Sequence, residues 1–190
     1  MLIAFTGAGI SAASGVPTFQ SQPGIRDRLV RTYANRHPEK YQQTINEMKA
    51  ACDAAEPNDA HLALAEYGVP VITMNVDGLH RRAGTRPENL LEIHGRLDDG
   101  SVVLYEDPAP LYDHARYWIR KLGPDDVLLY VGTSRYTAIS DEVYRLAFLQ
   151  NVGIVNIDHD AETLVRKALE LHKDKIESLP DFFTRTEDLG

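Results

Sequence analysis

The sequence predicts an α/β fold: a doubly wound, mostly parallel sheet of about six strands with helices on both faces. Six short apolar runs are spread along the 190 residues, and several are apolar without alternation, as in strands buried on both faces. Amphipathic patterns typical of helices lie between most of these runs. Strands that alternate with helices in this way indicate a Rossmann-like sheet.

The expected strands cover residues 2–6, 70–74, 90–93, 102–105, 127–131 and 153–157. The expected helices cover residues 59–67, 114–122, 141–150 and 161–171, with Asp59 and Asp160 as N-cap residues of the first and last. Residues 20–60 show no convincing strand, so we expect a small helical insertion within a single domain formed by residues 1–190. Asp98, Asp99 and Gly100 favour a tight turn, which predicts that residues 102–105 run antiparallel to residues 90–93 or lie off the main sheet.

The composition is acidic, with 20 Lys and Arg against 28 Asp and Glu and a net charge of −8. This balance argues against direct nucleic-acid binding. The single cysteine, Cys52, excludes an intramolecular disulfide and a four-thiolate zinc site, and its alanine-rich surroundings indicate a packing residue. No apolar stretch approaches the roughly 18 residues of a membrane span, and MLIAFTGAGIS is expected to be a strand rather than a signal peptide. We therefore expect a cytoplasmic protein without membrane contacts.

Gly7, Ala8 and Gly9 directly follow the first expected strand. Glycines at this point let the backbone approach a pyrophosphate, whose charge is favoured by the free N–H groups at a helix start. The same pattern is also typical of a plain tight turn between a strand and a helix. A dinucleotide fingerprint further requires an acidic residue at the end of a second strand, and no strand precedes Asp27. The ordinary dehydrogenase interpretation is therefore disfavoured.

Polar and small residues also follow the other expected strands, at the carboxyl ends where α/β sheets bind their ligands. They are Asn75, Asp77, His80, His94, Gly132, Thr133, Ser134, Asn156 and Asp158. His94 is suited to general-base work near neutral pH, although a lone histidine is also typical of a structural residue. Asn75 or Asp77 taken alone is more typical of an Asx-turn that caps a helix. The seven histidines show no metal-ligand spacing, so no metal site is predicted.

Five segments occur in a specific order: GAGISAASGVPTFQ, PNDAHLALAEY, TMNVDGLHRRAG, EIHGRL and VGTS. They resemble the sirtuin family of NAD-dependent protein lysine deacylases, whose members read GAGISxxSGIPDFR, PNxAHxAL, TQNxDxLHxxAG, ELHG and GTS. The resemblance spans residues 2–134, continues through residues 155–158 and includes the ending KIESLP. It implies a reaction that yields free lysine, nicotinamide and O-acyl-ADP-ribose.

The resemblance also implies the site residues. His94 is implied as the general base, with Asn75 and Asp77 as further catalytic residues. The residues implied for NAD binding are Gly7, Ala8, Gly9, Ser11, Phe19, Gln20, Asn75, Val76, Asp77, Gly132, Thr133, Ser134, Asn156 and Ile157. An acyl-lysine peptide is implied to add as a strand between residues 102–105 and the segment after Ser134. The residues implied to bind it are Val102, Val103, Tyr105 and Arg135.

This chain departs from the family pattern at several points. The two CxxC pairs that usually follow ELHG are absent, which implies a minimal form without the structural zinc module. Thr18 and Gln20 replace the usual Asp and Arg of the cofactor loop, and Met74 replaces a Gln. These departures leave two alternatives beside the deacylase: an NAD glycohydrolase or ADP-ribosyltransferase, and a non-catalytic module that binds NAD or ADP-ribose. The acyl group, the protein targets and the oligomeric state are not indicated by the sequence.

Overall fold

The structure, a computed structural model, describes residues 1–18, 22 and 24–176. Its described part contains one parallel sheet with the strand order β3-β2-β1-β4-β5. The strands are β1 (Leu2–Thr6), β2 (Val71–Thr73), β3 (Leu90–Glu92), β4 (Val127–Val131) and β5 (Gly153–Ile157). The order reverses between β1 and β4, so the chain leaves these two neighbouring strands in opposite directions. A crevice opens at their carboxyl ends, where such sheets bind ligands.

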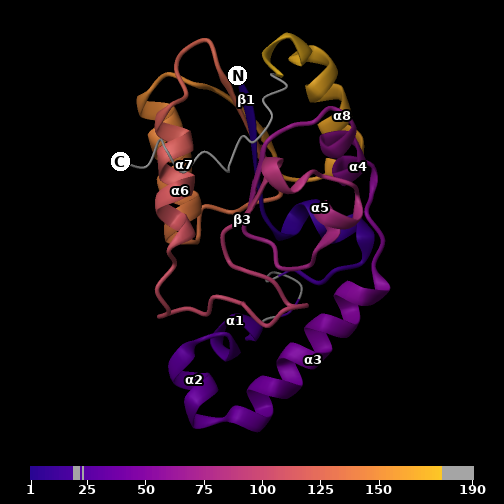
Figure 1. Cartoon of the computed structure of the whole chain (residues 1–190), viewed down its shortest axis with the longest axis vertical. Helices are drawn as coiled ribbons and strands as arrows, with labels where there is room; N and C mark the ends of the chain where they lie inside the picture. Colours follow the sequence, from indigo (N-terminus) through magenta and orange to yellow (C-terminus); the bar gives the residue numbers. More distant parts are fainter. Residues whose placement is uncertain (19–21, 23, 177–190) are drawn as a thin grey trace.

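The helices pack in two layers around the sheet and in a separate group below it (Figure 1). They are α1 (Ile25–Arg28), α2 (Arg31–Arg36), α3 (Pro38–Ala54), α4 (Asp59–Glu66), α5 (Leu79–Arg82), α6 (Leu111–Arg120), α7 (Ala138–Leu149) and α8 (Ala161–Leu171), with the 3-10 helices η1 (Ala8–Ser14), η2 (Pro87–Asn89) and η3 (Lys173–Lys175). Helices α6 and α7 cover one face of the sheet, and α4 and α8 cover the other.

The alternation of side chains along β1 explains the two layers. Leu2 and Ala4 point to one face and pack in the cluster formed with α4 and α8, whereas Ile3 and Phe5 point to the other face and pack with α6 and α7. All four side chains are buried. Burying a side chain such as Leu or Phe contributes about 1.5–3 kcal/mol, so both faces of this strand stabilise the sheet.

Helices α1 to α3 form a helical module, residues 25–54, with a small apolar cluster of its own. The cluster contains Leu29 and Ala34 of the module together with Leu104, and Met48 and Val102 pack against it. The strand expected at residues 102–105 is therefore wrong, although the segment does lie off the main sheet, which was one of its two expected placements. Its apolar side chains pack on the helical module instead of pairing with β3, and its β-structure is confined to one parallel bridge between Val30 and Tyr105.

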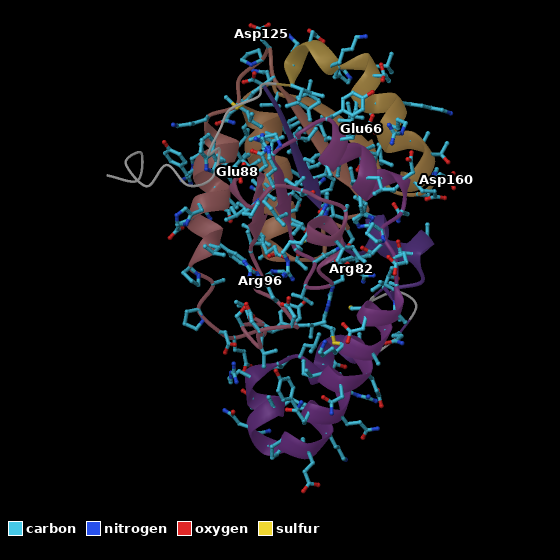
Figure 2. All side chains as sticks on the ribbon, turned by 45° about the vertical axis from the view of Figure 1, so that its right-hand side comes forward. Glu66, Arg82, Glu88, Arg96, Asp125 and Asp160 are labelled. Atoms are coloured by element: carbon cyan, nitrogen blue, oxygen red, sulfur yellow. The ribbon has the colours of Figure 1, made fainter. Side chains whose placement is uncertain are left out.

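Arg82, at the end of α5, connects the sheet-containing part to the C-terminal end of α3. Its Nη1 donates to the carbonyl oxygen of Cys52 at 3.1 Å, and its Nη2 lies 3.0 Å from a carboxylate oxygen of Glu56. Figure 2 shows Arg82 beside the upper end of α3. The helical module is thus held to the sheet through polar contacts as well as through Leu104.

Most of the expected elements are confirmed, with differences at their ends. Strands 2–6, 127–131 and 153–157 and helix 161–171 match β1, β4, β5 and α8, whereas α6 and α7 begin three residues earlier than expected. Asn58, not Asp59, is the N-cap of α4, because its Oδ1 accepts from the Ala60 N–H at 3.0 Å. Asp160 is the N-cap residue of α8 but makes no side-chain capping bond. The turn at Gly100 forms as expected, with φ of 74°.

Candidate functional site

A cavity of about 970 Å³ lies at the carboxyl ends of the strands, above the reversal in strand order. Its lining comes from the segments that follow β1 to β5, from the helical module, from residues 102–107 and from α6 and α7. The predicted residues that line it are Ala8, Gly9, Asn75, Val76, His94, Val102, Val103, Tyr105, Gly132, Thr133, Ser134, Arg135 and Asn156. The structure therefore brings together residues that are up to 148 positions apart in the chain.

The floor of the cavity depends on glycines at two crossing turns. The N–H of Gly9 donates to the carbonyl oxygen of Gly132 at 2.7 Å. A Cβ on Gly9 would lie 2.6 Å from the Cα of Gly132, and a Cβ on Gly7 would lie 2.9 Å from the Gly132 oxygen. Gly132 itself has φ of 57°, where a side chain is strained. The turns after β1 and β4 can approach this closely only because all three residues are glycine.

Ser11 organises the loop after β2. Its hydroxyl donates to Asp77 Oδ2 at 2.7 Å and accepts from Asn75 Nδ2 at 3.1 Å. It also lies 3.3 Å from His61 Nε2. Because the Asn58 N–H donates to His61 Nδ1 at 3.3 Å, the neutral ring carries its proton on Nε2 and donates to Ser11. The Ser11 hydroxyl thus donates to Asp77 and accepts from both Asn75 and His61. These bonds fix the positions of Asn75 and Asp77.

His61 and His80 lie side by side beneath this loop, with ring centroids 4.9 Å apart. Burial lowers the pKa of His61 to about 4, against the opposing charge of Asp77. Burial, and then the neighbouring His61, lower the pKa of His80 well below its ordinary range. His80 Nε2 lies 3.0 Å from Thr6 Oγ1, which donates to Thr73 Oγ1 at 2.8 Å. Both histidines are therefore neutral, buried parts of the support under Asn75.

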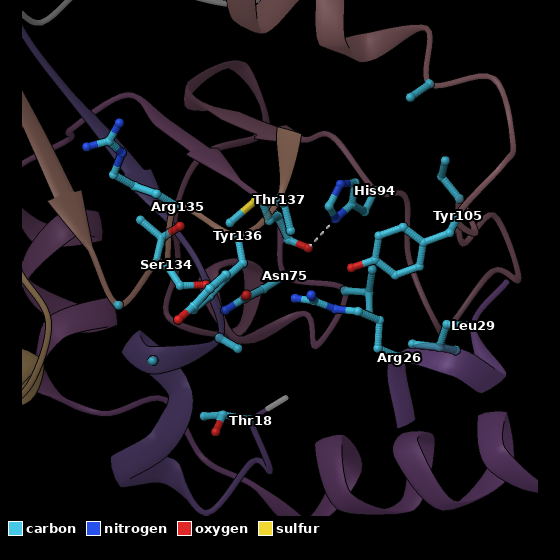
Figure 3. Close-up of a pocket in the computed structure, with 18 of the residues that line it drawn as sticks. Thr18, Arg26, Leu29, Asn75, His94, Tyr105, Ser134, Arg135, Tyr136 and Thr137 are labelled. Atoms are coloured by element: carbon cyan, nitrogen blue, oxygen red, sulfur yellow. Dashed lines mark hydrogen bonds between the residues drawn. The ribbon is translucent and has the colours of Figure 1, made fainter. Parts of the chain in front are cut away.

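His94 follows β3 and faces the cavity together with Asn75 and Tyr105 (Figure 3). Its Nδ1 lies 2.9 Å from the Met74 carbonyl oxygen, and its Nε2 lies 2.7 Å from the hydroxyl of Tyr112 on α6. Burial lowers the pKa of His94, while the backbone contact with Met74 opposes that shift. A neutral imidazole held in this way can take a proton, which suits a general base.

Other predicted residues lie at the edge of the cavity or outside it. Ile157 is buried in the core, where its carbonyl oxygen accepts from the Gly132 N–H at 2.7 Å. Asn156 is exposed, and its Nδ2 donates to Asp158 Oδ2 at 3.0 Å. The guanidinium of Arg135 points away from the centre of the cavity in Figure 3 and donates to Asp141 at 2.8 Å. Phe19 and Gln20 lie outside the described residues.

A second cavity, of about 380 Å³, adjoins the first and shares Ala8, Met48, Met74, Asn75 and Val76 with it. It extends toward α3 and is also lined by Asp77 and Cys52. Burial raises the pKa of the Cys52 thiol to about 12, so this cysteine is a packing residue rather than a nucleophile. Asp77 thus borders the smaller cavity, whereas His94 borders the larger one.

Sequence reasoning missed His61 and Tyr112 as site residues, and it named His80 as a candidate without a role. His61 lies within PNDAH and His80 within DGLH, both among the segments that carry the family resemblance. Tyr112 gave no signal, because it follows no expected strand and precedes the helix expected at residues 114–122. Among the described residues, no group of three or more His, Cys, Asp or Glu is placed to hold a metal ion. No helix in the described part of the chain is long and apolar enough to cross a membrane.

Comparison with known proteins assigns the family. A sequence model described as the Sir2 family matches residues 7–103. An NAD-dependent protein deacylase of Aeropyrum pernix is 45% identical over 171 residues, which cover 80% of this chain and 68% of that protein. The chain belongs to the Sir2 family. The sirtuin resemblance of the motifs is thereby confirmed.

Other Sir2 relatives share a smaller part of their length with this chain. A deacylase of Pyrococcus abyssi is 46% identical over 111 residues, which cover 50% of this chain and 42% of that protein. Among solved structures, a Sir2 homologue in complex with NAD has a TM-score of 0.78 at 22% identity, covering 93% of this chain and 90% of its own. A Sir2 structure with p53 peptide and NAD⁺ has a TM-score of 0.77 at 20% identity, covering 92% and 94%. These structures confirm the Rossmann-like fold. Within the described residues the sheet of this chain has five strands rather than about six.

Proposed function

We propose that the chain is an NAD-dependent protein lysine deacylase that releases nicotinamide and O-acyl-ADP-ribose. The observation that carries the proposal is the placement of neutral His94 and the Asn75 loop on one cavity at the reversal of strand order. The cavity volume of about 970 Å³ lies at the upper end of the range for ligand pockets, which suits a dinucleotide together with an acyl chain. The names of the Aeropyrum and Pyrococcus relatives support the same activity.

The described residues fit NAD. The glycine turns after β1 and β4 leave a shallow backbone floor, which would hold the phosphates beside Gly9, Gly132 and Thr133. Ser134 and Asn156 line the same side and would hold the adenosine half. When bound, NAD supplies the ADP-ribosyl group that accepts the acyl chain. Main-chain and hydroxyl groups can bind NAD in this way without the acidic residue that the usual dinucleotide fingerprint places at the end of a second strand.

The remaining residues divide the chemistry between the two cavities. Asn75 and Asp77, fixed by Ser11, would hold the nicotinamide ribose and carboxamide at the junction of the cavities, with Val76 lining that pocket. His94 would accept a proton from a ribose hydroxyl on its unprotonated Nε2. Val102, Val103 and Tyr105 border the larger cavity on the side away from the glycine turns, where the acyl-lysine would enter.

One observation favours the alternative of an NAD glycohydrolase or ADP-ribosyltransferase. The N–H of Val103 already donates to the His94 carbonyl oxygen at 2.9 Å. The N–H of Tyr105 donates to the Leu29 carbonyl oxygen at 2.9 Å, and its carbonyl oxygen accepts from the Arg31 N–H at 3.0 Å. Strand addition by a peptide needs free backbone groups, and these groups are engaged. Water or another nucleophile would not need them.

The deciding experiment follows nicotinamide release from NAD with and without a pool of acyl-lysine peptides. Release that requires peptide and disappears in His94→Ala is expected. The matched control is His159→Ala, which changes an exposed histidine outside the cavity. Release without peptide would instead support the glycohydrolase or transferase. Calorimetric NAD binding without any release would support a non-catalytic module.

We further infer that the chain needs no zinc. The turn that stands where relatives carry the zinc module is held by charges around Glu92, which is 8% exposed. Its carboxylate accepts from Arg96 Nε at 2.8 Å and Arg81 Nε at 3.2 Å, and Arg81 Nη1 also donates to Asp98 at 2.8 Å. We expect the purified chain to contain no stoichiometric zinc and to keep its unfolding temperature in EDTA. One zinc per chain, or a fall in that temperature, would contradict the inference.

A further inference from the structure

The two ring nitrogens of His94 have different partners, and their chemistry fixes the position of the proton. The Met74 carbonyl oxygen can only accept, so Nδ1, 2.9 Å away, carries the hydrogen. Burial lowers the pKa of His94, which keeps the ring neutral, so Nε2 holds a lone pair. The Tyr112 hydroxyl at 2.7 Å must then be the donor to Nε2. Any proton that His94 takes arrives along the line that Tyr112 already occupies.

Tyr112 is held in place independently of His94. It lies in the first turn of α6, lines the larger cavity and packs its ring 5.7 Å from the His94 ring, measured between centroids. The guanidinium of Arg116 lies 5.9 Å from the Tyr112 ring centroid and is itself fixed by Glu142 at 2.9 Å and Asp113 at 2.7 Å. Burial raises the pKa of Tyr112, so its hydroxyl remains protonated as a donor.

We propose that Tyr112 positions His94 and relays a proton to it: Tyr112 takes the proton of the reacting hydroxyl and gives its own proton to His94. In this step the O–H bond of the reacting hydroxyl breaks and its proton bonds to the Tyr112 oxygen. The Tyr112 O–H bond breaks in concert, and that proton bonds to Nε2. The imidazole becomes a cation, the reacting oxygen keeps the electron pair of its broken bond, and Tyr112 remains neutral. This role rests on the proposed function, because it needs a hydroxyl that gives up a proton at His94.

The positioning part is tested without turnover, by ¹⁵N NMR of the seven histidines in the full chain. Tyr112→Phe keeps the ring and removes the hydroxyl, while Tyr117→Phe on the same helix is the matched control, since Tyr117 packs on Trp118. His94→Ala assigns the signal. We expect the Nε2 resonance of His94 to move to higher frequency in Tyr112→Phe, as for an acceptor that loses its donor, and to stay in place in Tyr117→Phe. An unmoved resonance in Tyr112→Phe would overturn the proposal.

The transfer part is tested by steady-state kinetics of nicotinamide release with acyl-lysine peptide. Tyr112→Phe is expected to lower kcat by about 100-fold or more while KM for NAD stays near that of the unchanged chain. In mixtures of H₂O and D₂O, the rate of the unchanged chain should show two protons in motion and that of Tyr112→Phe one. An unchanged or higher kcat would mean that substrate displaces Tyr112, and would refute the transfer. If the unchanged chain binds NAD but never releases nicotinamide, the proposed function fails, and the resonance alone decides the positioning.

Discussion

Acid destabilisation of this chain should come mainly from His61 and His80. Both rings are buried and neutral, and the pKa of each is lowered in the folded state, to about 4 for His61. The unfolded chain binds their protons below the ordinary pKa of about 6.5, whereas the folded chain does not. Stability is therefore complete above that range and falls as the pH drops, until the folded-state pKa values are reached. Each group contributes about 1.36 kcal/mol per pH unit in this window.

The two histidines together contribute at most about 2.7 kcal/mol per pH unit to the slope between pH 5.5 and 4.5, and His94, whose pKa burial also lowers, adds to it. This is a large share of a typical total stability of about 5–15 kcal/mol. Urea unfolding at a series of pH values, followed by the fluorescence of the single, buried Trp118, measures the slope directly. His80→Gln should lower the slope by about 1.36 kcal/mol per pH unit, and His159→Gln, at an exposed position, controls for the substitution. A full slope in His80→Gln would refute the reasoning.

Three further predictions concern the glycine floor, the Ser11 hydroxyl and the turn after β3. Gly132→Ala places a Cβ 2.2 Å from the backbone nitrogen of Ile10, at a residue with positive φ. The unfolding temperature should therefore fall by more than about 4 °C. An unchanged unfolding temperature would contradict the close crossing of the turns after β1 and β4. Ser11→Ala leaves several buried groups without their partner and should cost about 2 kcal/mol or more in urea unfolding, whereas a cost near zero would mean that the loop is held otherwise. Glu92→Gln should cost about 1–2 kcal/mol, and the loss should shrink at 1 M salt, since the arginines beside it are partly exposed; a loss independent of salt would argue against ion pairing.

The sheet was predictable because its strands are mostly apolar, and β1 and β4 are buried along their whole length. The limits of these two strands, and of the partly exposed strand β5, were predicted to the residue. Residues 102–105 carry the same signal but bury Leu104 against Leu29 and Ala34 of the helical module. An apolar run reports that a segment is buried and not which partner buries it. This explains why one expected strand was wrong while the fold class was right.

The site was predictable where its residues follow strands. Asn75, His94 and Gly132 converge because the carboxyl ends of parallel strands meet at one edge of the sheet. His80 and Tyr112 reach the site from helices, and their position depends on how each helix packs on the sheet. A polar residue on a helix face gives no sign of the strand end that it will meet. Such supporting contacts are therefore found only in three dimensions.

The two sides of the larger cavity are held in different ways, and this has a consequence for substrate entry. The Asn75 loop is fixed from below by buried hydrogen bonds to Ser11 and Thr73, which do not depend on the helical module. The segment at residues 102–107 is tied to that module by two backbone bonds of Tyr105 and by the paired contact of Arg31 with Asp107 at 2.6 and 2.7 Å. Any displacement of the module that admits NAD must therefore carry the proposed acyl-lysine side of the cavity with it or break these bonds. The proposed cofactor side is preorganised, whereas the geometry of the proposed acyl side follows the position of α1 and α2.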